Sequence, residues 1–358
     1  MSEVAIILSD LYLAEHGRGG VDDREAAVPR DVLPALTRVA RFAGVSALPG
    51  DWRAWLAGWL GRGDVAAACD ATPAVIAAAA LDADHAAPAG GSVWLATPLH
   101  LIAGLSSVHL DYRGLLKLDR PALEQLCQDF DREFAQRGFS LRRLPGEGLL
   151  ACGPHFEHLP LTRDPARLLG GGIAGSTVQG AGAAALLRLG AELEMWLHAH
   201  PMNAARVRRH EAPLTTLWLW GGGAPLAPQL LMPPAPTAHP DATFMTVFGA
   251  DPVVAGLCML SGARLQPPAH SAHDLLNSGA ARTAAVIQLF HTDKPQPATL
   301  MDLLRHLDER VLAPVVTALK DGVIQQLTLI ANGRCSVLTA RDSLRFWRRS
   351  RGPWAVLQ

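Results

Sequence analysis

The sequence contains few of the residues that mark disulfide-stabilised and zinc-binding proteins. Its five cysteines are scattered over 358 residues without a CxxC pair. An odd number of widely spaced cysteines argues against a disulfide framework and a zinc knuckle, and it favours a reducing compartment. We therefore expect a cytoplasmic protein.

Long apolar runs and an excess of charge of one sign are also missing. No segment approaches the roughly 18 uninterrupted apolar residues that a membrane helix needs. The opening MSEVAIILSD has no basic region before its short apolar run, so it is typical of a strand and not of a signal peptide. The formal net charge is −1, which gives no whole-protein attraction to nucleic acid or to an anionic membrane. We expect neither as a partner.

Nucleotide-binding motifs are absent or incomplete. The chain has no Walker A motif. Gly170, Gly172 and Gly175 have GxGxxG spacing, but no strand precedes them, and no acidic residue follows at the distance that a ribose ligand needs. The sequence therefore gives no support to a dinucleotide site.

Strand and helix patterns alternate along most of the chain. Val4 to Leu8 form a continuous apolar run typical of a buried parallel strand, which ends at Ser9 and Asp10, where α/β folds place their ligands. The alternation predicts an α/β fold with a mainly parallel sheet flanked by helices.

The length of the chain suggests about two domains. Residues 93–160 have the pattern of a compact ββαββ unit, unlike the alternation on either side. We therefore predict a discontinuous core of residues 1–92 and 166–358, with a small inserted α+β domain at residues 93–165.

The stretch HAHPMNAARVRRHEAPLTTLWLWGGG, which begins at His198, concentrates polar side chains and glycines. His198 and His200 lie about 200° apart on a helix, so they do not face one metal ion there. Asn203 and Arg206 could hold a phosphate or carboxylate through paired hydrogen bonds, or they could form a solvated helix end. Both interpretations stay open.

The strand that follows in this stretch has apolar residues on both faces. Trp218 and Trp220 share one face, and Leu217 and Leu219 share the other. This pattern predicts a central strand. Its terminal glycines, Gly221, Gly222 and Gly223, permit close approach of either an anionic ligand or another element.

The order of these segments resembles the cofactor-independent phosphoglycerate mutases of the archaeal type, within the alkaline phosphatase superfamily. The likeness rests on the opening strand and helix, the ββαββ unit, the His-Pro-x-Asn turn with its arginines and glycine-ended strand, and the C-terminal alternation. It implies an alkaline-phosphatase-like fold, a Ser or Thr nucleophile, and two divalent metal ions that activate the nucleophile and neutralise the phosphoryl oxygens.

Compared with that family, the chain keeps few of the metal ligands. Asp10 matches the metal-binding Asp of the first strand, and Asp293 matches the Asp of an Asp-x-x-x-His element, where Pro297 replaces the His. Asn332 and Gly333 stand where the family has adjacent Asp and His ligands. These neutral replacements are poor ligands for hard cations.

The nucleophile is also unassigned. Ser92 and Thr97 are candidates only by elimination. The resemblance therefore describes a divergent, metal-ligand-poor relative.

Two functional hypotheses follow from this comparison. The first is a binding or regulatory protein without mutase activity and without a cofactor, which holds a small phosphorylated or carboxylated molecule, or a protein partner. Its predicted ligand-binding residues are His200, Asn203, Arg206, Gly221, Gly222 and Gly223. The alternative is a metal-dependent phosphotransferase or phosphohydrolase, with Mn or Zn held by a site rebuilt from Asp10, Asp293 and nearby histidines such as His291.

Other polar side chains are weaker candidates, and each also has an ordinary structural interpretation. His100 could face a cleft, His270 and His273 could gather on a metal beside Asp274, and Cys335 could be a nucleophile. The Arg- and Trp-rich C-terminal tail, which begins at Arg341, could bind an acidic partner or dock on its own domain.

Overall fold

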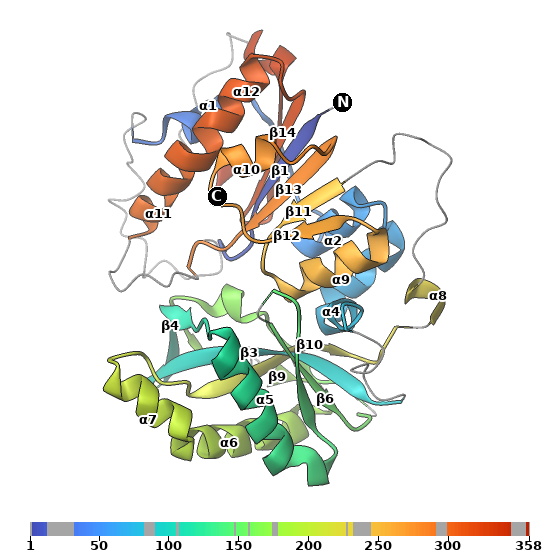
Figure 1. The fold of residues 1–358 in the computed structure, drawn as a ribbon, viewed down its shortest axis with the longest axis vertical. Helices are drawn as coiled ribbons and strands as arrows, with labels where there is room; N and C mark the ends of the chain where they lie inside the picture. Colours follow the sequence, from blue (N-terminus) through green and yellow to red (C-terminus); the bar gives the residue numbers. More distant parts are fainter. Residues whose placement is uncertain are drawn as a thin grey trace.

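The computed structural model describes most of the chain. It covers residues 2–12, 32–81, 90–104, 107–146, 148–156, 158–173, 178–226, 228–231, 245–290, 299–344 and 356–357. Two sheets, one mainly parallel and one antiparallel, build an upper and a lower lobe in Figure 1.

The upper lobe is a seven-stranded sheet in the order β12-β11-β13-β1-β14-β15-β2. The neighbours from β12 to β14 are parallel, whereas β15 and β2 are added antiparallel at one edge. Its strands are β1 (Glu3–Leu8), β2 (Gly44–Ala47), β11 (Met245–Phe248), β12 (Arg264–Gln266), β13 (Arg282–Ile287), β14 (Gln326–Ala331) and β15 (Arg334–Thr339). The predicted mixed α/β architecture with a mainly parallel sheet is confirmed.

Helices cover both faces of this sheet, and the alternation of β1 shows how (Figure 1). Ala5 and Ile7 belong to one apolar cluster, whereas Val4, Ile6 and Leu8 belong to another on the opposite face. The first cluster contains α2 (Trp52–Trp59), α3 (Ala66–Ala71), α4 (Pro73–Ala78) and α9 (Pro252–Ser261). The second contains α1 (Pro34–Phe42), α10 (Ala272–Leu276), α11 (Leu300–Leu307) and α12 (Ala313–Lys320).

The start of α1 is held by a carboxylate from a distant part of the chain. Asp308, which is 1% exposed, lies in a π-helical turn between α11 and α12. Its carboxylate accepts hydrogen bonds from the backbone N–H groups of Ala35 (3.1 Å) and Leu36 (2.6 Å). The first N–H groups of a helix have no partner within the helix, so Asp308 supplies what a local cap would otherwise supply.

We expect Asp308→Ala to lower the free energy of unfolding by about 2 kcal/mol, because it leaves two backbone donors without an acceptor in a buried place. Urea unfolding measures this effect. Asp321→Ala, at the exposed end of α12, is the matched control and should stay within about 0.5 kcal/mol of wild type. Equal losses in both variants would contradict the capping role.

The lower lobe is built on antiparallel strands. The sheet order is β5-β6-β3-β4-β8, and β10 pairs with the other side of β3. The bounds are β3 (Ser92–Ala103), β4 (Val108–Leu115), β5 (Ser140–Arg143), β6 (Leu149–Gly153), β8 (Gly171–Ile173) and β10 (Thr216–Gly223). A separate two-stranded ladder joins β7 (Leu161–Thr162) to β9 (Val178–Gln179).

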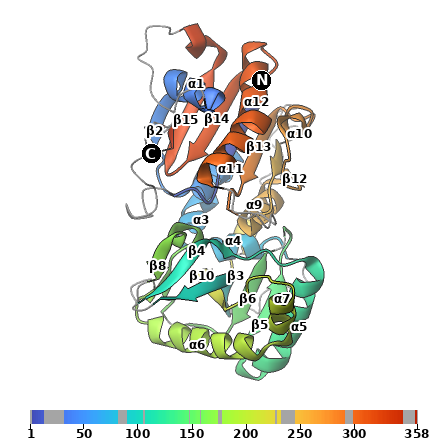
Figure 2. The same cartoon turned by 90° about the vertical axis from the view of Figure 1, so that its left-hand side faces the viewer.

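Three helices accompany this sheet, as Figures 1 and 2 show. They are α5 (Arg120–Phe134), α6 (Ala183–Ala199) and α7 (Pro201–Arg208). Local residues set both ends of α5, where Asp119 accepts from the N–H of Ala122 and Gly138 adopts a left-handed conformation. The short helix α8 (Pro228–Leu231) lies in the connection back to the upper lobe.

The boundary predicted at residue 165 does not match the sheets. The ββαββ unit is present as β3, β4, α5, β5 and β6, but β8 and β10, which follow residue 165, join the same antiparallel sheet. All described strands between residues 92 and 223 therefore pair antiparallel, and the parallel order resumes at β11. We call residues 92–223 the antiparallel lobe and the remainder the parallel lobe.

The prediction that the tryptophan-bearing strand is central was wrong, because among the described strands β10 pairs with β3 alone. Leu217 and Leu219 of β10 face α5 and α6, whereas Trp220 packs in the cluster of the parallel lobe. Both faces of β10 are apolar because the antiparallel sheet lies between its own helices and the other lobe. A two-sided apolar strand does not by itself distinguish this packing from a central parallel position.

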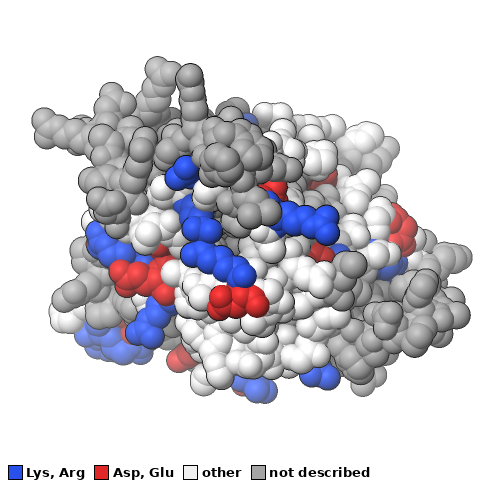
Figure 3. Space-filling view, turned by 90° about the horizontal axis from the view of Figure 1, so that it is seen from above, with Lys and Arg blue, Asp and Glu red and all other residues white. Residues whose placement is uncertain are grey.

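The surface agrees with the balanced composition. On the face shown in Figure 3, basic and acidic side chains lie beside one another. Among the described residues, no helix has both the length and the apolar character needed to cross a bilayer. All five cysteines are free thiols.

Candidate ligand site between the two lobes

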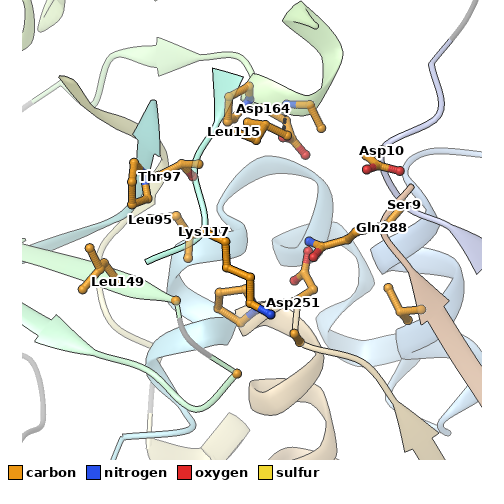
Figure 4. A pocket seen from close by; sticks show the side chains of 18 of the residues that line it. Ser9, Asp10, Leu95, Thr97, Leu115, Lys117, Leu149, Asp164, Asp251 and Gln288 are labelled. Carbon is orange, nitrogen blue, oxygen red and sulfur yellow. Dashed lines mark hydrogen bonds between the residues drawn. The ribbon is translucent and has the colours of Figure 1, made fainter. Parts of the chain in front are cut away.

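A cavity of about 280 Å³ lies between the lobes, at the carboxyl edge of the parallel strands. Ser9 and Asp10 reach it from the end of β1, Gln288 from the end of β13, and Asp251 from the turn after β11. The antiparallel lobe closes the other side (Figure 4). Open α/β sheets bind ligands at this edge, so the position itself marks the cavity as the candidate site.

Arg53 lines this cavity and is 5% exposed. Its Nη1 donates to Asp164 Oδ2 at 2.8 Å and lies 3.4 Å from Asp51 Oδ1. Its Nη2 donates to Asp251 Oδ2 at 2.9 Å. Asp164 comes from the antiparallel lobe, and the other three residues come from the parallel lobe. One guanidinium therefore joins carboxylates of both lobes.

Each of these carboxylates also caps the start of a helix. Asp51 caps α2, Asp251 caps α9, and Asp164 caps the short 3₁₀ turn of Pro165–Leu168. Asp164 and Asp251 use one oxygen for the cap and the other for Arg53. Helix starts favour negative charge, so the caps hold the three carboxylates in fixed orientations around Arg53.

Two further contacts tighten this cluster. The guanidinium of Arg53 lies over the rings of Trp52 (4.4 Å) and Trp220 (5.2 Å). Arg167 donates to Asp51 Oδ2 at 2.8 Å and lies 4.2 Å from the ring of Tyr12. Trp220 and Arg167 belong to the antiparallel lobe, so the contacts between lobes combine charge with aromatic packing.

The pKa values in the cluster reflect burial and charge. Burial alone would lower the pKa of Arg53, but the carboxylates of Asp251, Asp164 and Asp51 hold it well above its ordinary value. The pKa of Asp51 is lowered because Arg53 and Arg167 outweigh its burial. The pKa of Asp164 is raised, because its burial outweighs the effect of Arg53.

Asp10 is buried and is bonded to the backbone beyond β13. Its two oxygens accept from the N–H groups of Leu289 and Phe290, each at 2.8 Å. Burial raises the pKa of Asp10 to about 6, although both hydrogen bonds act to lower it. The carboxyl group therefore ties β1 to the chain after β13, while it also lines the cavity.

The antiparallel lobe contributes hydrogen-bond donors. The hydroxyl oxygen of Thr97 on β3 accepts from Nε1 of Trp220 at 2.8 Å, which leaves its proton able to donate. Lys117, after β4, is exposed at the cavity and extends into it (Figure 4). The antiparallel lobe thus brings Thr97, Lys117 and the carboxylate of Asp164 to the cavity, and the parallel lobe brings the carboxylates of Asp10 and Asp251.

Several predicted ligand-binding residues are instead bonded to neighbouring parts of the protein. His200 adopts an extended conformation before Pro201 and caps α7, with its Nε2 3.2 Å from Asp129. The amide of Asn203 bonds to Leu197 O, Leu214 O and Leu214 N, each at 2.7 Å. Arg206 donates to the carbonyl of Ala212 and pairs with Glu211.

Asn203 and Arg206 therefore fix the turn between α7 and β10, and His200 fixes the junction between α6 and α7. Among the described residues they do not line the interlobe cavity, and His200 and Asn203 border a separate groove beside α6 and α7.

The three glycines at the end of β10 serve packing. A Cβ atom would lie 2.5 Å from Pro73 at Gly221, 2.2 Å from Trp94 at Gly222, and 2.4 Å from Val75 at Gly223. Gly221 also has a φ of 63°. The strand end meets α4 and Trp94 too closely for any side chain, so of the two interpretations the structure supports close approach of another element.

The family's metal site does not assemble from the described residues. Both oxygens of Asp10 accept backbone N–H groups, and Asn332 and Gly333 form the left-handed turn between β14 and β15. Within the described ranges, no three His, Cys, Asp or Glu side chains come together as a metal-binding group. Asp293, Pro297 and His291 lie outside the described residues.

The weaker candidates have structural partners. His100 Nδ1 lies 2.9 Å from the carbonyl oxygen of Pro213, and Ser92 Oγ accepts from the N–H of Phe156. His273 bonds to Asn277 within α10, and Asp274 completes the capping box of that helix. Burial raises the pKa of Cys335, which opposes a nucleophilic role.

Most of the Arg- and Trp-rich tail lies outside the described residues, but its last two described residues support docking. Val356 and Leu357 are 1% and 0% exposed and join the apolar cluster of α1 and α12. The end of the tail therefore packs on the parallel lobe.

Sequence reasoning missed Arg53, Asp164 and Asp251. A signal for the two aspartates was present, since each precedes a proline at the start of a helical pattern, as capping residues do. Arg53 lies within the apolar, Trp-rich start of α2, where a charged side chain needs a partner. No pattern in the sequence shows that these three distant segments meet.

Comparisons with known proteins show distant structural similarity only. No protein-family model matches the sequence, and no curated protein matches it. The cofactor-independent phosphoglycerate mutase from Thermoplasma acidophilum DSM 1728 is 13% identical, with 94% of this chain and 89% of that chain covered and a TM-score of 0.39. The PH0037 protein from Pyrococcus horikoshii is 12% identical, with 94% and 87% covered and a TM-score of 0.46. Neither similarity assigns an activity to this chain.

Proposed function

We propose that the protein is a divergent phosphoglycerate-mutase-like protein, without mutase activity, that binds a small phosphorylated or carboxylated hydroxy compound between its lobes. The observation that carries the proposal is the cavity in which Lys117 and Thr97 face Asp10 and Asp251. An acidic group of the ligand would bind Lys117 and the Thr97 hydroxyl. Its hydroxyl groups would donate to the carboxylates opposite.

The size and lining of the cavity support this ligand class. A volume of about 280 Å³ is at the small end of ligand pockets, which suits a compact metabolite. Leu95, Leu115 and Leu149 line it beside the polar groups. Mixed linings of this kind orient a ligand through a few polar contacts and exclude water elsewhere.

Loss of catalysis is supported by the state of the residues that the family would use. Asp10 has both oxygens engaged by backbone N–H groups, and the turn of Asn332 and Gly333 supplies neither a carboxylate nor an imidazole. Thr97, the remaining nucleophile candidate at the cavity, accepts a hydrogen bond from Trp220. Among the described residues, no basic side chain is hydrogen-bonded to the Thr97 hydroxyl.

The proposal also covers the fold family. In this proposal the parallel lobe is an alkaline-phosphatase-like core, and the antiparallel lobe, residues 92–223, is an insertion between β2 and β11. The sequence order of the strands supports this arrangement. The insertion then supplies half of the ligand site.

Calorimetric titration of the protein with phosphoglycerate and with inorganic phosphate tests the ligand. We expect Lys117→Met to weaken binding of phosphoglycerate at least about 10-fold, because a charge-assisted hydrogen bond contributes about 1.5–3 kcal/mol. Lys320→Met, which removes an exposed lysine at the end of α12, is the matched control and should bind like wild type. Equal affinities of all three proteins would overturn the assignment of the acidic group to Lys117.

Mutase and phosphatase assays with added Mn²⁺ or Zn²⁺ separate binding from catalysis. The proposal expects no turnover. Stoichiometric metal together with turnover that disappears in Asp10→Ala would instead establish the alternative, a phosphotransferase or phosphohydrolase with a rebuilt metal site.

A further inference from the structure

Three aspartates surround Arg53 as carboxylates surround a bound cation, but here the cation is a side chain of the protein. Asp51, Asp164 and Asp251 direct carboxylate oxygens at one point, and the guanidinium of Arg53 occupies that point, with N–O distances of 3.4, 2.8 and 2.9 Å. The side chains of the three carboxylates are 12%, 9% and 6% exposed.

Three buried carboxylates that converge without a cation would repel one another and would carry a large desolvation cost. Proteins resolve this conflict by protonation, by a metal ion or by a basic side chain. Arg53 is the basic side chain here, and it contacts all three carboxylates, whereas Arg167 contacts Asp51. Asp164 and Asp251 therefore depend on Arg53.

We propose that Arg53 is a built-in counter-cation, whose guanidinium takes the place of a divalent metal ion among Asp51, Asp164 and Asp251 and joins the two lobes without metal. This role of Arg53 does not depend on which ligand the cavity binds. A charged side chain replaces a dissociable ion, so the arrangement of the lobes is independent of metal supply.

The geometry explains why a guanidinium suits this place. Its planar fork presents separate N–H groups to carboxylates on different sides, and two of these bonds reach opposite lobes. The rings of Trp52 and Trp220 hold its position. A divalent ion that retains bound waters spans oxygens separated by a comparable distance, as Mg²⁺ does in many protein sites.

Removal of the guanidinium should therefore create a metal requirement. We expect Arg53→Ala to lose about 10 °C in Tm without metal, and to regain about half of that loss with millimolar Mg²⁺, Mn²⁺ or Ca²⁺, since an ion bound only to the folded state stabilises it. Millimolar guanidinium ion should compete with the metal for the same place. Wild type should keep its Tm with the same ions and with EDTA.

Arg62→Ala is the matched control. Arg62 is also buried, but its bonds run to the exposed Asp64 and to the carbonyl oxygens of Leu230 and Leu260. Its loss should lower Tm without any recovery by divalent ions. Recovery in Arg53→Ala and none in Arg62→Ala supports the proposal, whereas the absence of recovery in Arg53→Ala, or equal recovery in both, overturns it.

A neutral variant decides the question if Arg53→Ala does not fold. Arg53→Met combined with Asp164→Asn and Asp251→Asn removes the cation together with the two charges that depend on it, and asparagine retains the helix caps. The proposal expects this variant to fold and to ignore divalent ions. An unfolded variant would show that Arg53 acts through its packing or hydrogen-bond geometry rather than as a counter-cation, and would overturn the proposal.

Discussion

Asp164→Ala is expected to lower the free energy of unfolding by about 3–5 kcal/mol, the loss usually found when one partner of a buried ion pair is removed. Asp164 carries the shorter of the two bonds that Nη1 of Arg53 makes, at 2.8 Å. It is also the carboxylate that the antiparallel lobe gives to the cluster. Urea unfolding followed by tryptophan fluorescence and by circular dichroism measures the loss.

Two comparisons isolate the ion pair from the helix cap. Asp164→Asn keeps an oxygen for the cap and another polar group near Arg53, so it should lose clearly less than the alanine variant. Asp119→Ala removes the exposed cap of α5, and it should lose only about 1 kcal/mol. If Asp164→Ala lost no more than Asp119→Ala, the contact with Arg53 would contribute nothing to stability.

The second large effect concerns pH and Asp10. The pKa of Asp10 is about 6 in the folded protein, against an ordinary value of 3.8. The folded state therefore favours the protonated form. The stability that this form gives is fully present below about pH 4, and it is lost as the pH rises through about 6. The two pKa values correspond to a change of about 3 kcal/mol.

Unfolding of wild type and Asp10→Ala at several pH values from 4 to 7 measures this contribution. The difference between the two proteins should favour wild type by about 2 kcal/mol more at pH 4 than at pH 7. Asp10→Ala also removes the acceptors of Leu289 and Phe290, but this loss does not vary with pH. A difference that stays flat from pH 4 to 7 would contradict the raised pKa.

Local patterns predicted much of the fold. The apolar run of β1 forms a buried strand, and the alternation of strands and helices is present, because such patterns depend on neighbouring residues. Trp52 and Trp59 of α2 are core residues, 3% and 7% exposed. Sheet membership was harder to predict, since β10 pairs with β3 across more than a hundred residues.

The candidate site was less accessible to sequence reasoning than the fold. The polar residues gathered near His198 attracted attention because they are close in sequence, yet Asn203 and Arg206 bond to nearby carbonyl groups. The cavity instead combines Arg53 with Asp164, which is 111 residues away in the sequence, and with Asp251, which is 198 residues away. Burial and tertiary pairing created this site, and neither leaves a local pattern.

The position of Trp220 gives the cavity an optical signal of its own. Its indole donates to the Thr97 hydroxyl and lies 5.2 Å from the guanidinium of Arg53, at the wall shared by both lobes. The emission of an indole responds to its hydrogen bonds and to nearby charge. A molecule that enters the cavity and bonds to Thr97 therefore alters the surroundings of one tryptophan among nine, and a difference spectrum against Trp220→Phe separates that change from the rest, without a label or a coupled reaction.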